Sequence, residues 1–126
     1  PSTAKRAGWT GCNILLSQIP LAGRIFYIQN SKIITKNKVL DDWQKVLFLK
    51  KSKEITTTGW LIDIMQCIDN MHKQSFTLQE LYLYETFLQA KHPDNHHIRD
   101  KIRQQLQFLR NQGYLTFNNK GFYKLN

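Results

Sequence analysis

The chain has 126 residues, of which 18 are Lys or Arg and 9 are Asp or Glu, so its formal net charge is +9. This length allows one domain or two small ones. No run of about 18 apolar residues could span a bilayer, and no cationic-then-apolar leader begins the chain, which argues against a membrane partner and predicts a soluble, cytoplasmic protein. The charge favours a polyanion, most simply nucleic acid, although a basic surface can also lack such a function.

The first half of the chain predicts a β-hairpin. Residues 23–29 are β-branched and aromatic, and residues 32–35, which follow the turn residues Asn30 and Ser31, predict the partner strand. Residues 41–49 predict either a short amphipathic helix or the start of another strand. This half has too few apolar residues for a core of its own, so we expect it to be the edge of something larger.

A polar, cationic stretch at residues 50–59 predicts a linker. The predicted domains are therefore residues 1–53 and residues 54–126. Cys12 and Cys67 have none of the spacings that are typical of a zinc site, so we predict no metal site and expect both to be buried apolar residues rather than ligands or a disulfide.

The second half begins with two predicted helices. Thr58 is predicted to cap the first, which runs to Met71 with apolar residues at helical spacing. Thr77 is predicted to cap the second, with Glu80 three residues later completing a capping box. This helix is expected to continue to about Ala90.

A third helix and a hairpin follow. Residues 92–94 break the second helix, Asn95 is predicted to cap the third, and Gly113 is placed to end it in the left-handed conformation. Residues 114–125 predict strand, turn and strand, with the turn at Asn118 to Gly121. Three helices and a terminal hairpin are the order of a winged helix-turn-helix, so the predicted fold class is α+β.

The third helix has one apolar and one polar face. Relative to Ile98, the apolar side chains lie within about 80° at 100° per residue, and a cationic, amide-bearing set lies opposite. Arg can bridge guanine O6 and N7, and Gln or Asn can bridge adenine N6 and N7. The alternative is a solvated surface. The candidate base-reading residues are Asn95, His96, His97, Arg103, Gln104 and Gln107, and the candidate phosphate contacts are Arg99, Lys101, Arg110, Lys120 and Lys124.

No catalytic constellation is predicted in the chain. Pro93-Asp94 is similar to the opening of a PD-(D/E)xK nuclease motif, in which acids hold Mg²⁺, but no acid-x-Lys strand follows within reach. His96 and His97 are adjacent, so on a helix they diverge by about 100° and cannot jointly hold a metal. Trp9, between two glycines in a cationic setting, could stack on a base or anchor a core, and composition leaves these alternatives open.

Several segments resemble, in one collinear order over nearly the whole chain, the C-terminal half of DpnI-type methyl-directed restriction endonucleases. The most specific are residues 6–14 and residues 101–107. The matching segments are Thr3-Ala4-Lys5-Arg6-Ala7-Gly8-Trp9-Thr10-Gly11-Cys12-Asn13-Ile14, Ser17-Gln18-Ile19-Pro20, Gly23-Arg24-Ile25-Phe26, Phe48-Leu49-Lys50-Lys51-Ser52, Phe76-Thr77-Leu78 and His97-Ile98-Arg99-Asp100-Lys101-Ile102-Arg103-Gln104-Gln105-Leu106-Gln107.

The resemblance implies a bacterial protein that binds double-stranded DNA at GATC with N6-methyladenine, by a PD-(D/E)xK nuclease domain followed by a winged helix. Residues 1–53 would be a fragment of the nuclease domain, comprising edge strands and a hairpin, and Trp9 would match a methyl-sensing tryptophan. The family's catalytic acids and lysine have no counterpart here. We therefore expect this chain to bind but not cut, as a monomer without a cofactor, and expect Mg²⁺ in the complete enzyme.

Two other classes of protein fit the same pattern. A stand-alone winged-helix transcriptional regulator would commonly dimerise on a palindrome with half-sites roughly 34–36 Å apart. A protein-interaction winged helix would instead present its basic face to an acidic partner. DNA binding by a monomer at one methylated site would argue against the transcriptional regulator. Indifference to DNA at low salt would favour the protein-interaction domain.

Overall fold

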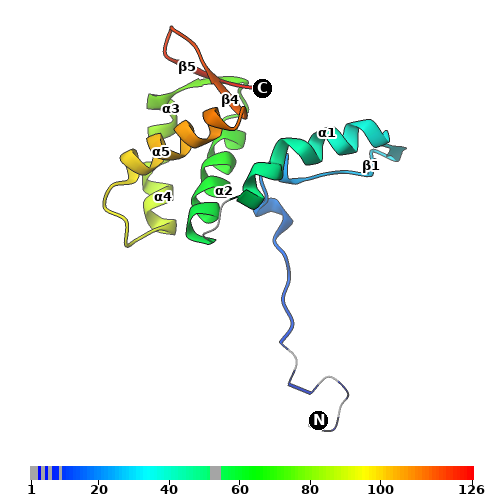
Figure 1. Ribbon diagram of the computed structural model, residues 1–126. Coiled ribbons are helices and arrows are strands. Elements are labelled where there is room, and N and C mark those ends of the chain that lie inside the picture. The colour runs from blue at the N-terminus through cyan, green and yellow to red at the C-terminus, as the bar shows by residue number, and fades with distance from the viewer. Residues whose placement is uncertain (1–2, 4, 6, 9, 52–54) are drawn as a thin grey trace.

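The computed structural model describes residues 3, 5, 7–8, 10–51 and 55–126. A body of helices and a small sheet forms from residues 55–126, and an arm formed by residues 16–51 projects from it (Figure 1). Residues 10–15 lead away from both parts without regular structure. Trp9 lies outside the described residues. No helix in the described part of the chain is long and apolar enough to cross a membrane.

The arm contains the predicted hairpin, with shorter strands than expected. The 3-10 helices η1 (Leu16–Gln18) and η2 (Leu21–Gly23) precede β1 (Ile28–Gln29) and β2 (Lys32–Ile33), which pair antiparallel. Asn30 and Ser31 have φ of +51° and +61°. A two-residue turn with positive φ at both positions matches the twist of a hairpin, so the sequence signal at this turn was correct.

The segment predicted as helix or strand is a helix, α1 (Lys36–Val46), followed by the 3-10 turn η3 (Leu47–Lys51). It begins five residues before the predicted start at Asp41, because Thr35 is its N-cap and the Thr35 hydroxyl accepts the Lys38 N–H at 3.4 Å. No residue of α1 is buried. The arm thus has no core of its own, as expected from its few apolar residues.

Ring packing and hydrogen bonds connect the arm to the body. The Phe48 ring, only 5% exposed, lies 6.1 Å from the ring of Phe108 and 6.2 Å from that of Tyr114. The Leu21 N–H donates to the Asp69 carboxylate at 2.6 Å, and the Gln66 side chain donates to a backbone carbonyl of η1 at 3.4 Å. Burial raises the pKa of the Asp69 carboxyl, and the hydrogen bond from the Leu21 N–H partly offsets this rise.

The body begins with α2 (Ile55–Asn70), which supplies much of the core. The prediction that Thr58 caps this helix was wrong, because the helix is already formed at Ile55 and includes the residues predicted as a linker from 55 onward. β-branched threonines only weakly disfavour a helix, and burial of one face outweighs that preference. The buried residues of this face are Trp60, Leu61, Ile64, Met65, Cys67 and Ile68.

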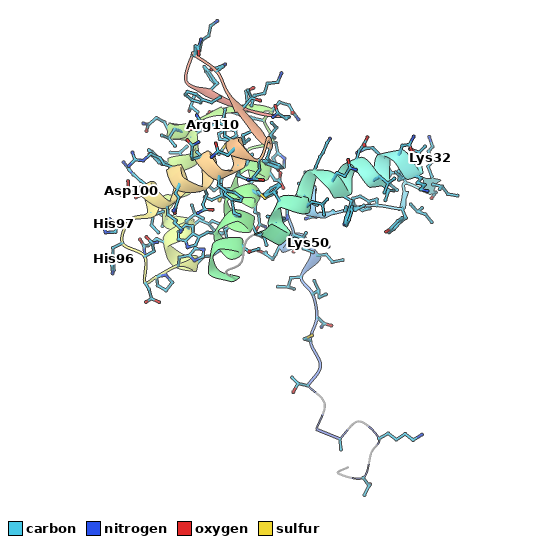
Figure 2. The ribbon with its side chains drawn as sticks, viewed as in Figure 1. Lys32, Lys50, His96, His97, Asp100 and Arg110 are labelled. Atoms are coloured by element: carbon cyan, nitrogen blue, oxygen red, sulfur yellow. The ribbon has the colours of Figure 1, made fainter. Side chains whose placement is uncertain are left out.

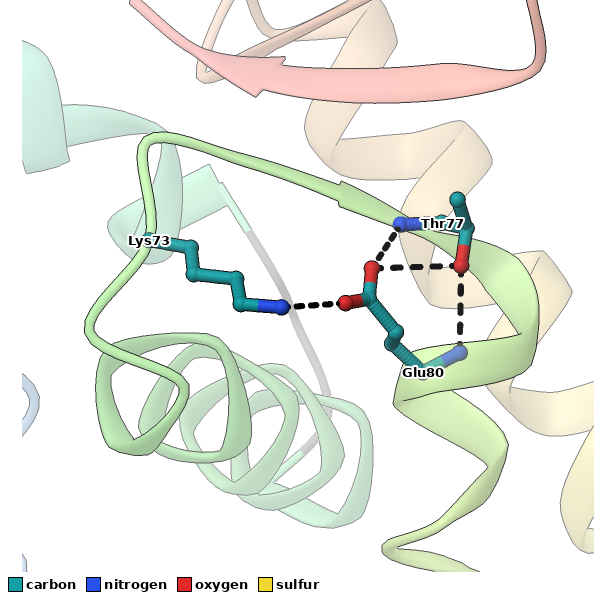
Figure 3. Close-up of polar contacts among 3 residues, drawn as sticks. All are labelled: Lys73, Thr77 and Glu80. Atoms are coloured by element: carbon teal, nitrogen blue, oxygen red, sulfur yellow. Dashed lines mark hydrogen bonds and ion pairs between the residues drawn. The ribbon is translucent and has the colours of Figure 1, made fainter.

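The capping box is confirmed at the start of α3 (Leu78–Tyr82). The Thr77 hydroxyl accepts the Glu80 N–H at 3.3 Å, and the Glu80 carboxylate accepts the Thr77 N–H at 2.7 Å (Figure 3). Lys73 also pairs with this carboxylate. These hydrogen bonds satisfy backbone donors that the first turn of a helix leaves without partners.

The predicted second helix is broken into α3 and α4 (Glu85–Lys91). At the break, Leu83 N–H donates to Glu80 C=O and Tyr84 N–H donates to Leu81 C=O, so the turn is tightened to three-residue spacing. Leu83 is 82% exposed there. Neither Pro nor Gly marks this position, which is why the sequence pattern predicted a continuous helix.

The third helix is α5 (Ile98–Asn111), and its predicted end is confirmed. Gly113 has φ +76°, its N–H donates to Arg110 C=O, and Tyr114 N–H donates to Leu109 C=O. This pair of hydrogen bonds is a Schellman motif. The prediction of Asn95 as the cap was wrong: His97 is the N-cap residue, and the Asn95 side chain instead accepts the His97 N–H at 2.8 Å.

The sheet has three strands in the order β3-β5-β4, all antiparallel. β4 (Leu115–Phe117) and β5 (Phe122–Leu125) form the predicted hairpin, while β3 (Ser75–Thr77) was not predicted because its three residues were interpreted only as the approach to a helix cap. The elements follow in the order helix, strand, broken helix, helix and hairpin, and the last strand lies between the other two. This is the winged helix-turn-helix arrangement.

The two cysteines differ. Cys67 is fully buried on α2, and burial together with the Asp63 carboxylate raises the pKa of its thiol to about 12. It therefore stays protonated and packs as an apolar residue, as predicted. Cys12 is exposed, contrary to prediction, because the segment that carries it extends away from the body.

Candidate nucleic-acid interface

Helix α5 separates its two faces as the sequence predicted. Four of its apolar side chains are packed into the core with at most 3% exposure, and the predicted base-reading residues Arg103, Gln104 and Gln107 are exposed. Four basic residues and one acidic residue give α5 a net charge of +3. An exposed helix face with this charge suits the major groove of DNA, which admits one α-helix. The buried apolar residues are Ile98, Ile102, Leu106 and Leu109.

An open hollow of about 530 Å³ lies at the beginning of α5. Five of the predicted contact residues meet at this hollow. They come from the segment before α5 and from the first two turns of that helix. Figure 2 shows His96, His97 and Asp100 on the side of the body that faces away from α1. The lining residues are Asp94, Asn95, His96, His97, Asp100, Lys101 and Gln104.

Two arginines of α5 have acidic partners within the chain. Arg103 pairs with Asp100 one turn earlier on the same helix, and both side chains are more than half exposed. Arg99 donates to the Glu85 carboxylate at 2.8 Å and lies over the Tyr82 ring, 4.9 Å from its centroid. Exposed ion pairs are weak, typically below about 1 kcal/mol, so a phosphate or guanine can replace the carboxylate.

The side chains at the end of α5 form a short hydrogen-bonded chain. Arg110 donates to Gln107 Oε1 at 2.6 Å, and Gln107 Nε2 donates to Asn111 Oδ1 at 2.7 Å. Asn111 was not among the predicted site residues, although its spacing of four from Gln107 places both on one helix face. The carbonyl and amino groups of Gln107 are therefore oriented by its neighbours.

A second unpredicted residue, Asn118, shapes the turn between β4 and β5. Its side-chain oxygen accepts the N–H of Lys120 at 3.1 Å and that of Phe122 at 2.9 Å. Gly121 has φ +82°, a conformation that glycine adopts without strain. The turn holds Lys120 at the tip of the hairpin, which projects beyond the helices, and Lys124 is exposed on β5 (Figure 1).

The aromatic residues of the hairpin pack on the body and on each other. The Tyr123 ring stacks on that of Phe76 at 5.6 Å and lies 4.8 Å from that of Phe117. Phe122 and Phe117 remain about 40% exposed. These ring contacts show that Tyr123 serves packing, and the cationic groups of the hairpin are its lysines.

No group of three or more His, Cys, Asp or Glu side chains within the described ranges could hold a metal ion. The described residues therefore do not fit a Mg²⁺ centre, and we place no metal ligand among them. Trp9, the predicted methyl-sensing residue, lies outside the described residues.

The strand order, the broken second helix and the basic exposed face of α5 define a winged helix-turn-helix DNA-binding domain. Comparison with family models agrees. Residues 56–125 match the model DpnI_C, described as the Dam-replacing HTH domain, and residues 1–52 match the model DpnI, described as the Dam-replacing family. The chain belongs to the DpnI family, with part of that family's first domain followed by its helix-turn-helix domain.

Proposed function

We propose that the chain binds duplex DNA at GATC in which adenine carries an N6-methyl group, as the C-terminal part of a methyl-directed type II endonuclease. The observation that carries this proposal is the exposed face of α5, where Arg103, Gln104 and Gln107 lie opposite the buried apolar residues. Membership of the DpnI family supports it.

The contacts follow from the donors on this face. Arg103 matches guanine O6 and N7, whereas Gln104 and Gln107 match adenine. Methylated adenine keeps N7 and one N6 hydrogen, so an amide contact survives while apolar contact detects the methyl group. Asn95, His96 and His97 approach the same groove from the beginning of α5.

The remaining cations hold the backbone of the duplex. Phosphate contacts position a protein without reading sequence and make its affinity depend on salt. Arg99 and Arg110 would exchange their present partners for phosphates. The proposed phosphate contacts are Arg99, Lys101, Arg110, Lys120 and Lys124.

Two further parts of the proposal concern the complete enzyme. Trp9 senses the methyl groups, and Mg²⁺ belongs to a catalytic part of the protein that this chain does not contain. The chain binds as a monomer and does not cut. Mg²⁺ is not needed for the binding test below, whereas the preference for methylated duplexes in that test would include the contribution of Trp9.

The test is a competition titration at near-physiological salt with short duplexes that carry GATC with both, one or neither adenine methylated, and a scrambled duplex. We expect the tightest binding to the fully methylated duplex, by about 5-fold to 150-fold for one well-placed contact of about 1–3 kcal/mol. Equal affinity for all four duplexes would leave a DNA-binding winged helix and reject methyl-GATC recognition by this chain.

A further inference from the structure

The turn between α4 and α5, residues 92–97, is held by one side chain that the proposed DNA contacts do not include. The Gln89 amide, half-buried on α4, points its nitrogen at three backbone carbonyls of this turn. The distances are 3.4 Å to His92 O, 3.3 Å to Pro93 O and 3.0 Å to Asn95 O. An amide NH₂ has two hydrogens for these three acceptors, so two of the carbonyls must share one hydrogen. The amide can contact all three only while the turn keeps its present shape.

The start of the turn is fixed independently. The His92 ring stacks on that of Trp60 with centroids 3.8 Å apart, and its Nε2 lies 2.7 Å from Asp63 Oδ2. The Asn95 N–H donates to His92 C=O at 3.0 Å. Gln89 therefore ties the later, solvent-facing part of the turn to a segment that is already anchored on α2.

The consequence falls on the beginning of α5. The Asn95 carbonyl is the nearest partner of Gln89, and the Asn95 side chain accepts the His97 N–H at 2.8 Å, so the amide of Gln89 fixes the residue that in turn orients the N-cap. A small change in this turn moves the first residues of α5 relative to α4. In a helix-turn-helix, those residues face the bases.

We propose that Gln89 is a positioning residue for sequence recognition: it sets the turn so that Asn95, His96 and His97 meet the base edges, without touching DNA itself. This inference rests on the proposed function. A methionine has similar bulk but no N–H donor, so Gln89→Met removes the hydrogen bonds and keeps the packing. Phosphate contacts on the hairpin and on the flanks of α5 are unaffected by this change.

The experiment measures two quantities for the parent chain, Gln89→Met and the control Gln44→Met, which removes an exposed amide from α1. The first is the ratio of affinities for fully methylated GATC and scrambled duplex. The second is amide hydrogen exchange at Asn95 and His97, with Leu106 in the core of α5 as reference. A further variant, Gln89→Leu, covers the case in which methionine packs poorly.

We expect Gln89→Met to lower the affinity ratio about tenfold by weakening specific binding alone, with faster exchange at Asn95 and His97 and unchanged exchange at Leu106. Equal losses on both duplexes, or an unchanged ratio, would overturn the proposal. If the parent chain does not discriminate, the proposed function fails and recognition through this turn fails with it. If exchange at Asn95 and His97 is as slow in Gln89→Met as in the parent chain, then Gln89 does not hold the turn, and that structural claim is overturned whatever the affinity ratio.

Discussion

The Asp63 carboxylate on α2 accepts a hydrogen bond from the His92 imidazole, with 2.7 Å between Oδ2 and Nε2. This contact connects the first helix of the winged helix to the end of α4. The same carboxylate accepts Lys91 Nζ at 2.7 Å on its other oxygen. Its side chain is only 12% exposed, whereas Lys91 keeps 33% of its surface in water. This small cluster of polar contacts connects α2 with the end of α4 and the turn that leads to α5.

We predict that Asp63→Asn lowers the free energy of unfolding by about 1.5–3 kcal/mol, the range for hydrogen bonds to charged groups. The loss should stay below the 3–5 kcal/mol typical of a fully buried pair, since Lys91 can regain water. Urea denaturation measures it. Asp42→Asn, which breaks the exposed pair with Lys38, is the control and should cost less than about 1 kcal/mol. Equal losses for the two variants would contradict the special role of Asp63.

Arg103→Ala should weaken binding to methylated GATC by about 5-fold to 150-fold, because a two-bond contact to guanine contributes about 1–3 kcal/mol. Binding to a scrambled duplex should change much less. Titration of both duplexes at one salt concentration gives the comparison. If both affinities fall together, Arg103 contacts phosphate and not a base.

Lys120→Ala should weaken binding to every duplex by a similar factor. The hydrogen bonds of Asn118 hold Lys120 at the tip of the hairpin, where it can contact a phosphate. Each lost phosphate contact lowers the slope of log K against log salt by about 1. Affinities at several salt concentrations provide that slope, and an unchanged slope would remove Lys120 from the interface.

Gly113→Ala should destabilise the fold by about 1–2 kcal/mol, since an alanine is strained at φ +76°. Apart from its two chain neighbours, no described residue has an atom within 4 Å of an added Cβ at this position, so the cost comes from the backbone alone. Gly59→Ala is the matched control: the space there is also open, but the residue is inside α2, where alanine is favoured by about 0.5–1 kcal/mol. Thermal unfolding should show opposite signs for the two variants.

Stability should fall in acid partly through Glu80. The hydrogen bond from Lys73, followed by that from the Thr77 N–H, lowers the pKa of this carboxyl in the folded protein. A lowered folded-state pKa gives stability that is fully present above the ordinary glutamate pKa and is lost as the pH falls through the folded-state value. Glu80→Gln, which can still form a capping box, should remove this part of the pH dependence of the unfolding midpoint. The same acid-induced loss in both proteins would exclude Glu80 as a source.

The sequence predicted the elements whose signals are periodic or local. Helix α5 could be predicted because its apolar residues recur at helical spacing over fourteen residues, and its end because Gly113 allows the left-handed conformation. The capping box of Thr77 and Glu80 is equally local. For the same reason the sequence predicts that the amide-bearing, cationic face of α5 is exposed, and Arg103, Gln104 and Gln107 are exposed in the structure.

The features that were missed depend on contacts between distant residues. Strand β3 has only three residues and is recognisable as a strand only through its pairing with β5. The break at Leu83 has neither Pro nor Gly, and the start of α2 is decided by burial against the core. The end of α4 at Lys91 lies within one residue of the predicted end, but the hydrogen bonds from Gln89 depend on how the turn folds back on α4, which the sequence pattern does not give.

The position of β5 between β3 and β4 also has a consequence for how the domain is made. Ser75 pairs with Lys124, which is 49 positions later (124 less 75), so the sheet cannot close until that distant segment has left the ribosome. Until then α2 to α4 have no sheet to pack against. We therefore expect the nascent helix-turn-helix to stay incomplete and to bind DNA only after this strand has been inserted, so that translation itself sets when the domain becomes active.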